Sequence, residues 1–129
     1  MKLPFAILAF CLFAGSLAAQ PSKGARMEIE PAEHDFGAVR QDQKLTHDFL
    51  VRNTGTEDLT LLRIATSCGC AAALPAERVV PPGGSTTLQV TLETRKYKGT
   101  VERSISIASN DRKKVATVKV RAFVEVPEP

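Results

Sequence analysis

Two cysteines, Cys68 and Cys70, flank Gly69 in the segment TSCGCAAALPA, residues 66–76. A cysteine thiolate is both a nucleophile and a ligand for soft metals, so chemistry is most expected here. Three interpretations fit the spacing: a local disulfide, two reduced cysteines in an apolar corner, and two thiolates that bind Cu(I) or exchange disulfides. Zinc is disfavoured because a structural zinc site normally takes four ligands.

A disulfide between these cysteines would add little to the stability of the whole domain. Closing a three-residue ring contributes only about 1.6 kcal/mol, against about 4.7 kcal/mol for a hundred-residue loop. Alternate residues of a strand lie roughly 6.6 Å apart, at the upper limit for a disulfide, so a bend at Gly69 is required. Our hypothesis is a local disulfide, Cys68–Cys70, that shapes the loop Ser67–Glu77 as a partner-binding surface.

The chain has two histidines, and a copper site formed by Cys68 and Cys70 could recruit one of them. His47 shares a strand face with Phe49, which predicts a partly buried core histidine. His34 opens the segment HDFG, where we expect a cap or a turn bond. The sequence places neither histidine near the cysteines. Copper with Cys68, Cys70 and His47 therefore remains the alternative, and our main expectation is no metal and no cofactor.

Catalysis has little support in the sequence. Ser67 and Ser85 lack a glycine-flanked nucleophile turn, and Gly83-Gly84 follows prolines in a turn instead of forming a phosphate-binding loop. The net charge of +3 is too small to indicate a nucleic-acid partner. Basic stretches at 95–98 and 112–114 fall at predicted turns, where solvated charge is the ordinary interpretation and contact with an anionic envelope surface the sharper one. We expect no enzyme.

The N-terminal residues predict export. Lys2 precedes an apolar run, Leu3–Leu17, and small residues follow, so we predict a cleaved signal peptide at 1–19 and a flexible tether at 20–26. The run is too short for a convincing membrane span. Cys11 leaves with the signal peptide, because Phe10 is not the small residue that a lipoprotein signal needs. The protein is then periplasmic or extracellular, where disulfides persist.

The rest of the chain alternates apolar and polar residues with period two, which is typical of half-buried antiparallel strands. The clearest runs are 45–53, 86–94, 104–109 and 116–126, and turn signals occur at 53–55, 81–84, 98–99 and 109–111. This pattern predicts an all-β fold, a single β-sandwich of about seven antiparallel strands over residues 27–126. The predicted core comprises Phe49, Val51, Leu88, Val90, Leu92, Ile105, Ile107, Val118 and Val120.

The segments HDFGAV, FLVRNTG, LRIATSCGC, VVPPGGS and IASND occur in an order that resembles the secreted bacterial domain of unknown function 1573. The resemblance covers roughly residues 27–125. It implies the Ig-like superfold of Hydin-type and major-sperm-protein-like domains, with no established activity to carry over. Residues 67–70 match its cysteine motif. Ala71, Asp42 and Arg112 depart from its usual residues, which affects local turns and not the fold.

Together these observations predict a non-enzymatic, exported Ig-like module that binds a protein or cell-envelope partner. We expect a monomer without a nucleic-acid partner and without a membrane span. The alternative is a periplasmic CxC thiol site that binds Cu(I) or exchanges disulfides through Cys68 and Cys70.

Overall fold

The alternating segments form strands, as the sequence predicts. The computed structural model describes residues 15, 23–112 and 115–127, and in this part of the chain it contains nine strands and no helix. No helix able to span a membrane therefore occurs among these residues. Apart from Gly15, the predicted signal peptide lies outside the described residues, as do residues 20–22 of the tether. The signal peptide stays a prediction. The prediction of a flexible tether is wrong for residues 24–26, because Ala25 is buried in the core and the Gly24 carbonyl accepts from Thr56 N–H at 2.8 Å.

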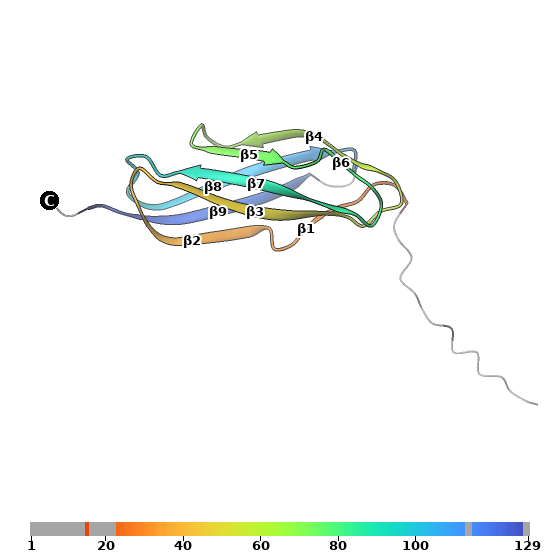
Figure 1. Cartoon of the computed structure of the whole chain (residues 1–129), viewed down its shortest axis with the longest axis horizontal. Coiled ribbons are helices and arrows are strands. Elements are labelled where there is room, and N and C mark those ends of the chain that lie inside the picture. Colours follow the sequence, from red (N-terminus) through yellow and green to blue (C-terminus); the bar gives the residue numbers. More distant parts are fainter. Residues whose placement is uncertain (1–14, 16–22, 113–114, 128–129) are drawn as a thin grey trace, which may run out of the picture.

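Four strands form one sheet, in the order β1, β3, β7 and β5. Their bounds are Met27–Ile29 for β1, Lys44–Asn53 for β3, Ser85–Glu93 for β7 and Ala71–Pro75 for β5. All neighbouring pairs are antiparallel. Figure 1 shows this layer with β5 at one border and β1 at the other. The long central strands β3 and β7 carry the alternation that the sequence made visible.

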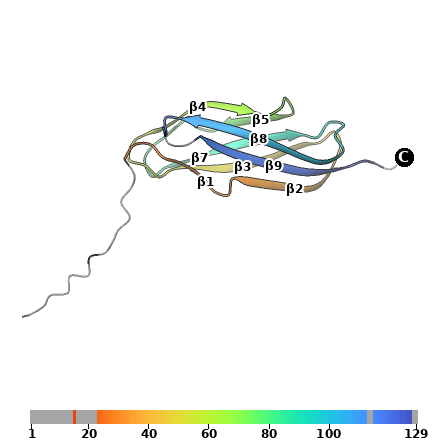
Figure 2. The ribbon, with the colours of Figure 1, turned by 180° about the vertical axis from the view of Figure 1, so that it is seen from behind.

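The second sheet has five strands, in the order β2, β9, β8, β4 and β6. Their bounds are Glu33–Arg40 for β2, Ala116–Glu125 for β9, Gly99–Ser109 for β8, Leu59–Thr66 for β4 and Val79–Val80 for β6. Strand β2 runs parallel to β9, while the other pairs are antiparallel. Figure 2 shows β2 and β9 next to each other from behind.

Two details of the sequence prediction are wrong: the structure has nine strands instead of about seven, and one strand pair is parallel. The chain crosses from one sheet to the other at 30–32, so its first extended segment becomes two strands, β1 and β2. This crossing brings β2 alongside β9 in the same direction. Strand β6 has only two residues, too few to show an alternating pattern.

The core lies between the two sheets and contains every residue that the alternation placed there. All nine predicted core residues are at most 1% exposed. Leu59, Leu61 and Val80 are equally buried and were not predicted, because their strands have a mixed pattern or only two residues. The prediction of an inward face is thus confirmed for the long strands.

The turn motifs hold the strands together through specific polar contacts. The side-chain amide of Asn53 donates to the carbonyls of Glu57 at 2.7 Å and Val80 at 2.9 Å, and its oxygen accepts from Gly55 at 3.0 Å. Across the predicted turn at 81–84, Gly84 N–H donates to the carbonyl of residue 81 at 2.9 Å. Gly83 has a φ of 76°, the left-handed conformation that a type II turn requires.

The Asn-Asp motif at 110–111 is likewise structural. Asn110 accepts from Thr60 N–H at 2.8 Å, which ties the end of β8 to β4. The buried Asp111 carboxylate accepts from Met27 N–H at 3.0 Å and lies 3.9 Å from the Arg26 guanidinium. This motif therefore anchors strands, and we look for functional residues elsewhere.

Candidate functional site: the Cys68–Cys70 loop

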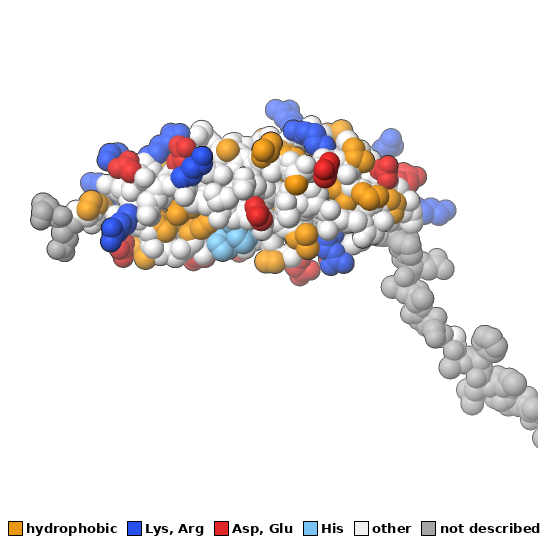
Figure 3. Space-filling view, in the orientation of Figure 1, with side chains coloured by type: hydrophobic (Ala, Val, Ile, Leu, Met, Phe, Trp, Pro, Cys, Tyr) orange, Lys and Arg blue, Asp and Glu red, His pale blue; other side chains and the backbone are white. Residues whose placement is uncertain are grey.

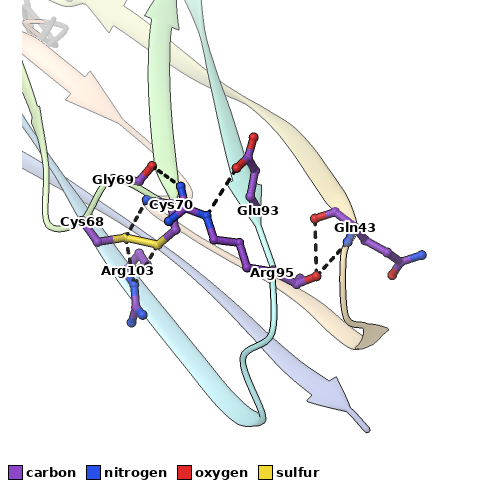
Figure 4. Close-up of polar contacts among 8 residues, drawn as sticks. Gln43, Cys68, Gly69, Cys70, Glu93, Arg95 and Arg103 are labelled. Atoms are coloured by element: carbon purple, nitrogen blue, oxygen red, sulfur yellow. Dashed lines mark hydrogen bonds and ion pairs between the residues drawn. A yellow bond between two sulfur atoms is a disulfide. The ribbon is translucent and has the colours of Figure 1, made fainter. Parts of the chain in front are cut away.

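The Cys68–Cys70 loop connects β4 with β5 and crosses from the five-stranded to the four-stranded sheet. The backbone N–H of Ser67 donates to the carbonyl of Ser104 in β8 at 3.0 Å. At the end of β7, Glu93 N–H donates to the carbonyl of Cys70 at 2.8 Å. The loop is therefore fixed to both sheets, as Figure 4 shows in part.

In the structure the two sulfur atoms are joined as a disulfide, with the Cα atoms 5.4 Å apart. The chain bends at Gly69, which shortens the separation of roughly 6.6 Å expected for an extended strand. Cys70 is only 2% exposed and belongs to the core, while Cys68 is half-buried at the edge of it. The oxidation state of the pair in the cell stays a prediction.

Arg103 contacts both sulfur atoms, and sequence reasoning missed it. Its Nε–H donates to Sγ of Cys68 at 3.1 Å and to Sγ of Cys70 at 3.2 Å. The guanidinium also lies over the Tyr97 ring, 5.3 Å from its centroid. Figure 4 shows the side chain reaching the disulfide from β8. A cation therefore lies beside the two sulfurs, which would become acidic thiols on reduction.

The position of Arg103 in β8 is unusual because it faces inward. It pairs in register with Val120, and it shares its strand face with the buried Val101 and Ile105. Among the described residues, no carboxylate forms an ion pair with it. In the sequence, Arg103 could have been singled out because it is a charged residue in phase with the apolar residues of its strand.

A second arginine, Arg95, holds the same loop without touching sulfur. Its guanidinium donates to the carbonyl of Gly69 at 2.9 Å and lies 3.5 Å from the Glu93 carboxylate. Lys96 pairs with Asp42. Two cations of the basic stretch at 95–98 therefore have local partners. Of the stretch at 112–114, residues 113 and 114 lie outside the described part.

The two histidines meet at the side of the sandwich, one from each sheet. The rings of His34 in β2 and His47 in β3 stack with centroids 3.6 Å apart and planes 7° from parallel. Phe36 and Phe49 contact them edge-on at 4.7 and 4.8 Å. Figure 3 shows histidine side chains in pale blue on this face. The expectation that His34 caps a turn is wrong, since it lies within a strand and stacks.

Burial lowers the pKa of His47 below its ordinary value of 6.5. The neighbouring His34 lowers this pKa further, and Asp48 partly offsets the two effects. The physical cause is that a protonated imidazole loses hydration when half-buried and is repelled by a second imidazolium. His47 is half-buried, as its strand position predicts.

The structure brings Cys68 and Cys70 together but places His47 against His34. In the described part of the chain, no group of three or more histidine, cysteine, aspartate or glutamate side chains is arranged to hold a metal ion. The stack itself is a poor pair of ligands, because a bound metal lies in the plane of each imidazole and nearly parallel rings share no such point. Copper stays a prediction.

Strands β4, β5 and β6 form one border of the sandwich, which we call the β4–β6 rim. Three of its apolar side chains are exposed: Leu62 and Val79 on the outer face of the five-stranded sheet, at 62% and 52%, and Leu74 on the outer face of the four-stranded sheet, at 66%. Strand β4 contacts both β5 and β6. Because Pro75 in β5 has no N–H, strand pairing along that edge is restricted.

Comparison with known proteins adds the family. The model of the family described as "Protein of unknown function (DUF1573)" matches residues 27–124. The chain belongs to this family. The match covers the sandwich up to the penultimate residue of β9, including the Cys68–Cys70 loop, and confirms the resemblance seen in the ordered sequence motifs. No curated protein matches the DUF1573 chain.

Solved structures share the fold of this DUF1573 domain. A Porphyromonas gingivalis W83 protein of unknown function has a TM-score of 0.68 at 23% identity, covering 84% of this chain and 51% of its own. The VesB protease of Vibrio cholerae has a TM-score of 0.64 at 13% identity, and the match covers 75% of this chain and 31% of the protease. The ASH/PapD-like domain 7 of human CEP192 has a TM-score of 0.61 at 10% identity, and the match covers 99% of this chain and 100% of the human domain.

These likenesses concern the fold alone, because all three identities are low. The chain spans about half the length of the Porphyromonas protein and about a third of the protease. The human domain matches over its entire length, which shows that the sandwich shares the fold of this PapD-like domain. Such a fold carries many unrelated functions, so function has to be argued from the sites of this chain.

Proposed function

We propose that this DUF1573 domain is an exported, non-enzymatic binding module that contacts a protein partner through the β4–β6 rim. The observation that carries the proposal is the exposure of Leu62 and Val79 on one face of this border and of Leu74 on the other. Single exposed apolar residues are common, but three on the edge strands of one border favour an interaction surface that wraps around it. Leu74 also lies within the loop 67–77 that the sequence singled out.

The surroundings of the rim favour a protein over an anionic surface. Arg63, Glu77 and Arg78 are exposed on the same segments, so both signs of charge flank the apolar side chains. An apolar centre with a mixed polar border is the usual composition of a protein–protein contact. A lipid headgroup or an anionic polymer would instead favour a continuous basic surface.

Export is part of the proposal and rests on the predicted signal peptide at 1–19. A location in the periplasm or outside the cell would also favour oxidation of Cys68 and Cys70. The disulfide would then fix the connection between β4 and β5, the two longest strands of the rim. In this way the loop would shape the binding surface without carrying much global stability.

The test is capture of partners from an envelope extract with immobilised wild type, with a Leu62→Asp/Leu74→Asp variant and with a Phe123→Asp variant. Phe123 is a matched control, since it is 51% exposed and lies on β9, away from the rim strands. We expect the rim variant to lose the protein that wild type captures and the control to retain it. Equal capture by all three folded proteins, or equal loss in both variants, would contradict the proposal.

A further inference from the structure

We propose that Cys68 and Cys70 form a redox-active disulfide, and that Arg103 is positioned to bind the thiolate released when a dithiol reduces it. The substrate class is a pair of thiols, in a protein or a small molecule. This inference does not depend on the β4–β6 rim, because it concerns only the two sulfurs and the guanidinium that contacts them.

The charge of Arg103 lies partly inside the sandwich. Arg103 is half-buried on the β8 face that carries the buried Val101 and Ile105, so its guanidinium loses part of its hydration. The described residues provide it with no carboxylate, and its Nε–H donates to two disulfide sulfurs, which are weak acceptors. Reduction would replace this weak contact by a charge-assisted hydrogen bond to a thiolate.

Arg103 is held in place before any reaction. Its Nη1 donates to the Glu102 carbonyl at 2.8 Å, and the Tyr97 ring lies against the guanidinium. The donor therefore needs no rearrangement when negative charge develops on sulfur. Preorganised donors of this kind stabilise a developing charge more than mobile ones do.

The two cysteines differ in burial. Cys68 is half-buried, whereas Cys70 is only 2% exposed. An incoming thiolate can therefore reach Sγ of Cys68 more readily than Sγ of Cys70. The buried Cys70 sulfur becomes the leaving group, and it stays within reach of Arg103 Nε at 3.2 Å.

Reduction of the disulfide by a dithiol proceeds in two steps. A thiolate of the dithiol attacks Sγ of Cys68, a new S–S bond forms, and the Cys68–Cys70 bond breaks with its electron pair going to Cys70. The second thiolate of the dithiol then attacks the dithiol sulfur that is bonded to Sγ of Cys68. A disulfide forms within the dithiol, and Cys68 is released. Two electrons pass from the dithiol to the protein. Of the two protons that the dithiol loses, one binds Cys68 and one goes to solvent, since Cys70 stays a thiolate beside Arg103.

This arrangement makes a clear prediction about redox equilibrium. Stabilising the reduced form makes a disulfide more oxidising. In buffers of oxidised and reduced dithiothreitol, we expect the wild-type domain to have a midpoint above about −300 mV, the region below which structural disulfides lie. A midpoint at or below this value would show a purely structural bridge and overturn the proposal.

The role of Arg103 is tested by Arg103→Gln, with Arg95→Gln as the matched control. Both arginines hold the same loop, but only Arg103 donates to sulfur. Since hydrogen bonds to charged groups are the strong ones, we expect Arg103→Gln to disfavour reduction by roughly 10- to 100-fold, a shift of roughly 30–60 mV. Arg95→Gln is expected to change the equilibrium by less than about threefold.

A second readout separates a charge effect from a structural one. We expect thiolate absorbance at 240 nm to persist to lower pH in the reduced wild type than in reduced Arg103→Gln, with Arg103→Lys between them because it keeps the charge. If Arg103→Gln does not fold, the wild type, Arg103→Lys and Arg95→Gln give the same comparison. Equal midpoints and equal pH profiles for wild type and the Arg103 variants would overturn the assignment.

Discussion

The Cys68–Cys70 loop and the His34–His47 stack each bring two reactive side chains together, but their electrostatic surroundings are opposite. At the loop, the cation Arg103 contacts two sulfurs that become acidic on reduction. At the stack, two rings that become cationic on protonation face each other at 3.6 Å. The loop is therefore suited to gain negative charge, whereas the stack resists gaining positive charge.

This difference shows why residue type alone does not identify a site. Cysteine and histidine are both common metal ligands, and the sequence offered Cys68, Cys70 and His47 as one possible set. In the structure the histidines lie at the side of the sandwich, and each contacts a phenylalanine edge-on. The cysteines instead lie in a connection fixed to both sheets and contacted by an inward-facing arginine.

The largest effect is expected where both regions depend on the same core. Leu92 pairs in register with Ala71, just after the loop, whereas Leu88 pairs with Phe49, which contacts the histidine stack. Both leucines are fully buried. We expect Leu92→Ala and Leu88→Ala each to lower the free energy of unfolding by about 2–5 kcal/mol, measured by denaturant titration. A loss below about 0.5 kcal/mol at either site would mean that the two regions do not share a core.

A smaller effect is expected when the loop loses its bond. The Cys68→Ser/Cys70→Ser variant removes a ring worth about 1.6 kcal/mol in chain entropy, so it should stay folded with a modestly lower melting temperature. Circular dichroism and thermal unfolding measure this, with reduced wild type as the comparison. A loss above about 4 kcal/mol, or an unfolded variant, would show that the bridge supports the whole sandwich.

The smallest effect is expected at the histidine stack and depends on pH. Because the pKa of His47 is lowered in the folded protein, the unfolded chain binds more protons as pH falls below 6.5. This contribution to stability is present above pH 6.5 and is lost as pH falls through the lowered pKa. Denaturant titrations at pH 7.5 and pH 5.5 measure it.

The matched control for this pH effect is His47→Phe, which keeps an aromatic ring in the stack and removes the titration. We expect the wild type to lose more stability than this variant on acidification, by less than about 1 kcal/mol. Carboxylates that titrate in the same range are present in both proteins, so the difference reports the imidazole. An equal loss in the two proteins would mean that the stack tolerates protonation.

The sequence predicts local features well, and the structure shows why other features escaped it. Period-two alternation placed Leu88 and Ile105 in the core because side-chain direction in a strand is a local property. The bend at Gly69 was also local, since two cysteines one residue apart require it. Arg103 lies 35 residues from Cys68, so their contact depends on how β8 and the loop come together in three dimensions.

The histidine stack illustrates the same limit. His34 and His47 meet only because the chain crosses between the sheets at 30–32 and aligns β2 beside β9. No local pattern around His34 distinguishes a turn from a strand at this crossing. The β4–β6 rim was partly visible, since Leu74 lay in the predicted loop, but Leu62 and Val79 joined it only through contacts between strands.

The central claim is that Cys68 and Cys70 are joined by a disulfide in the cell, since the role of Arg103 and the shaping of the rim both depend on that bond. Counting thiols in the protein purified without reductant, under native and denaturing conditions, tests it most directly. We predict no free thiol in either condition. Two thiols that become reactive only on unfolding, or two thiols released by a chelator, would contradict the account.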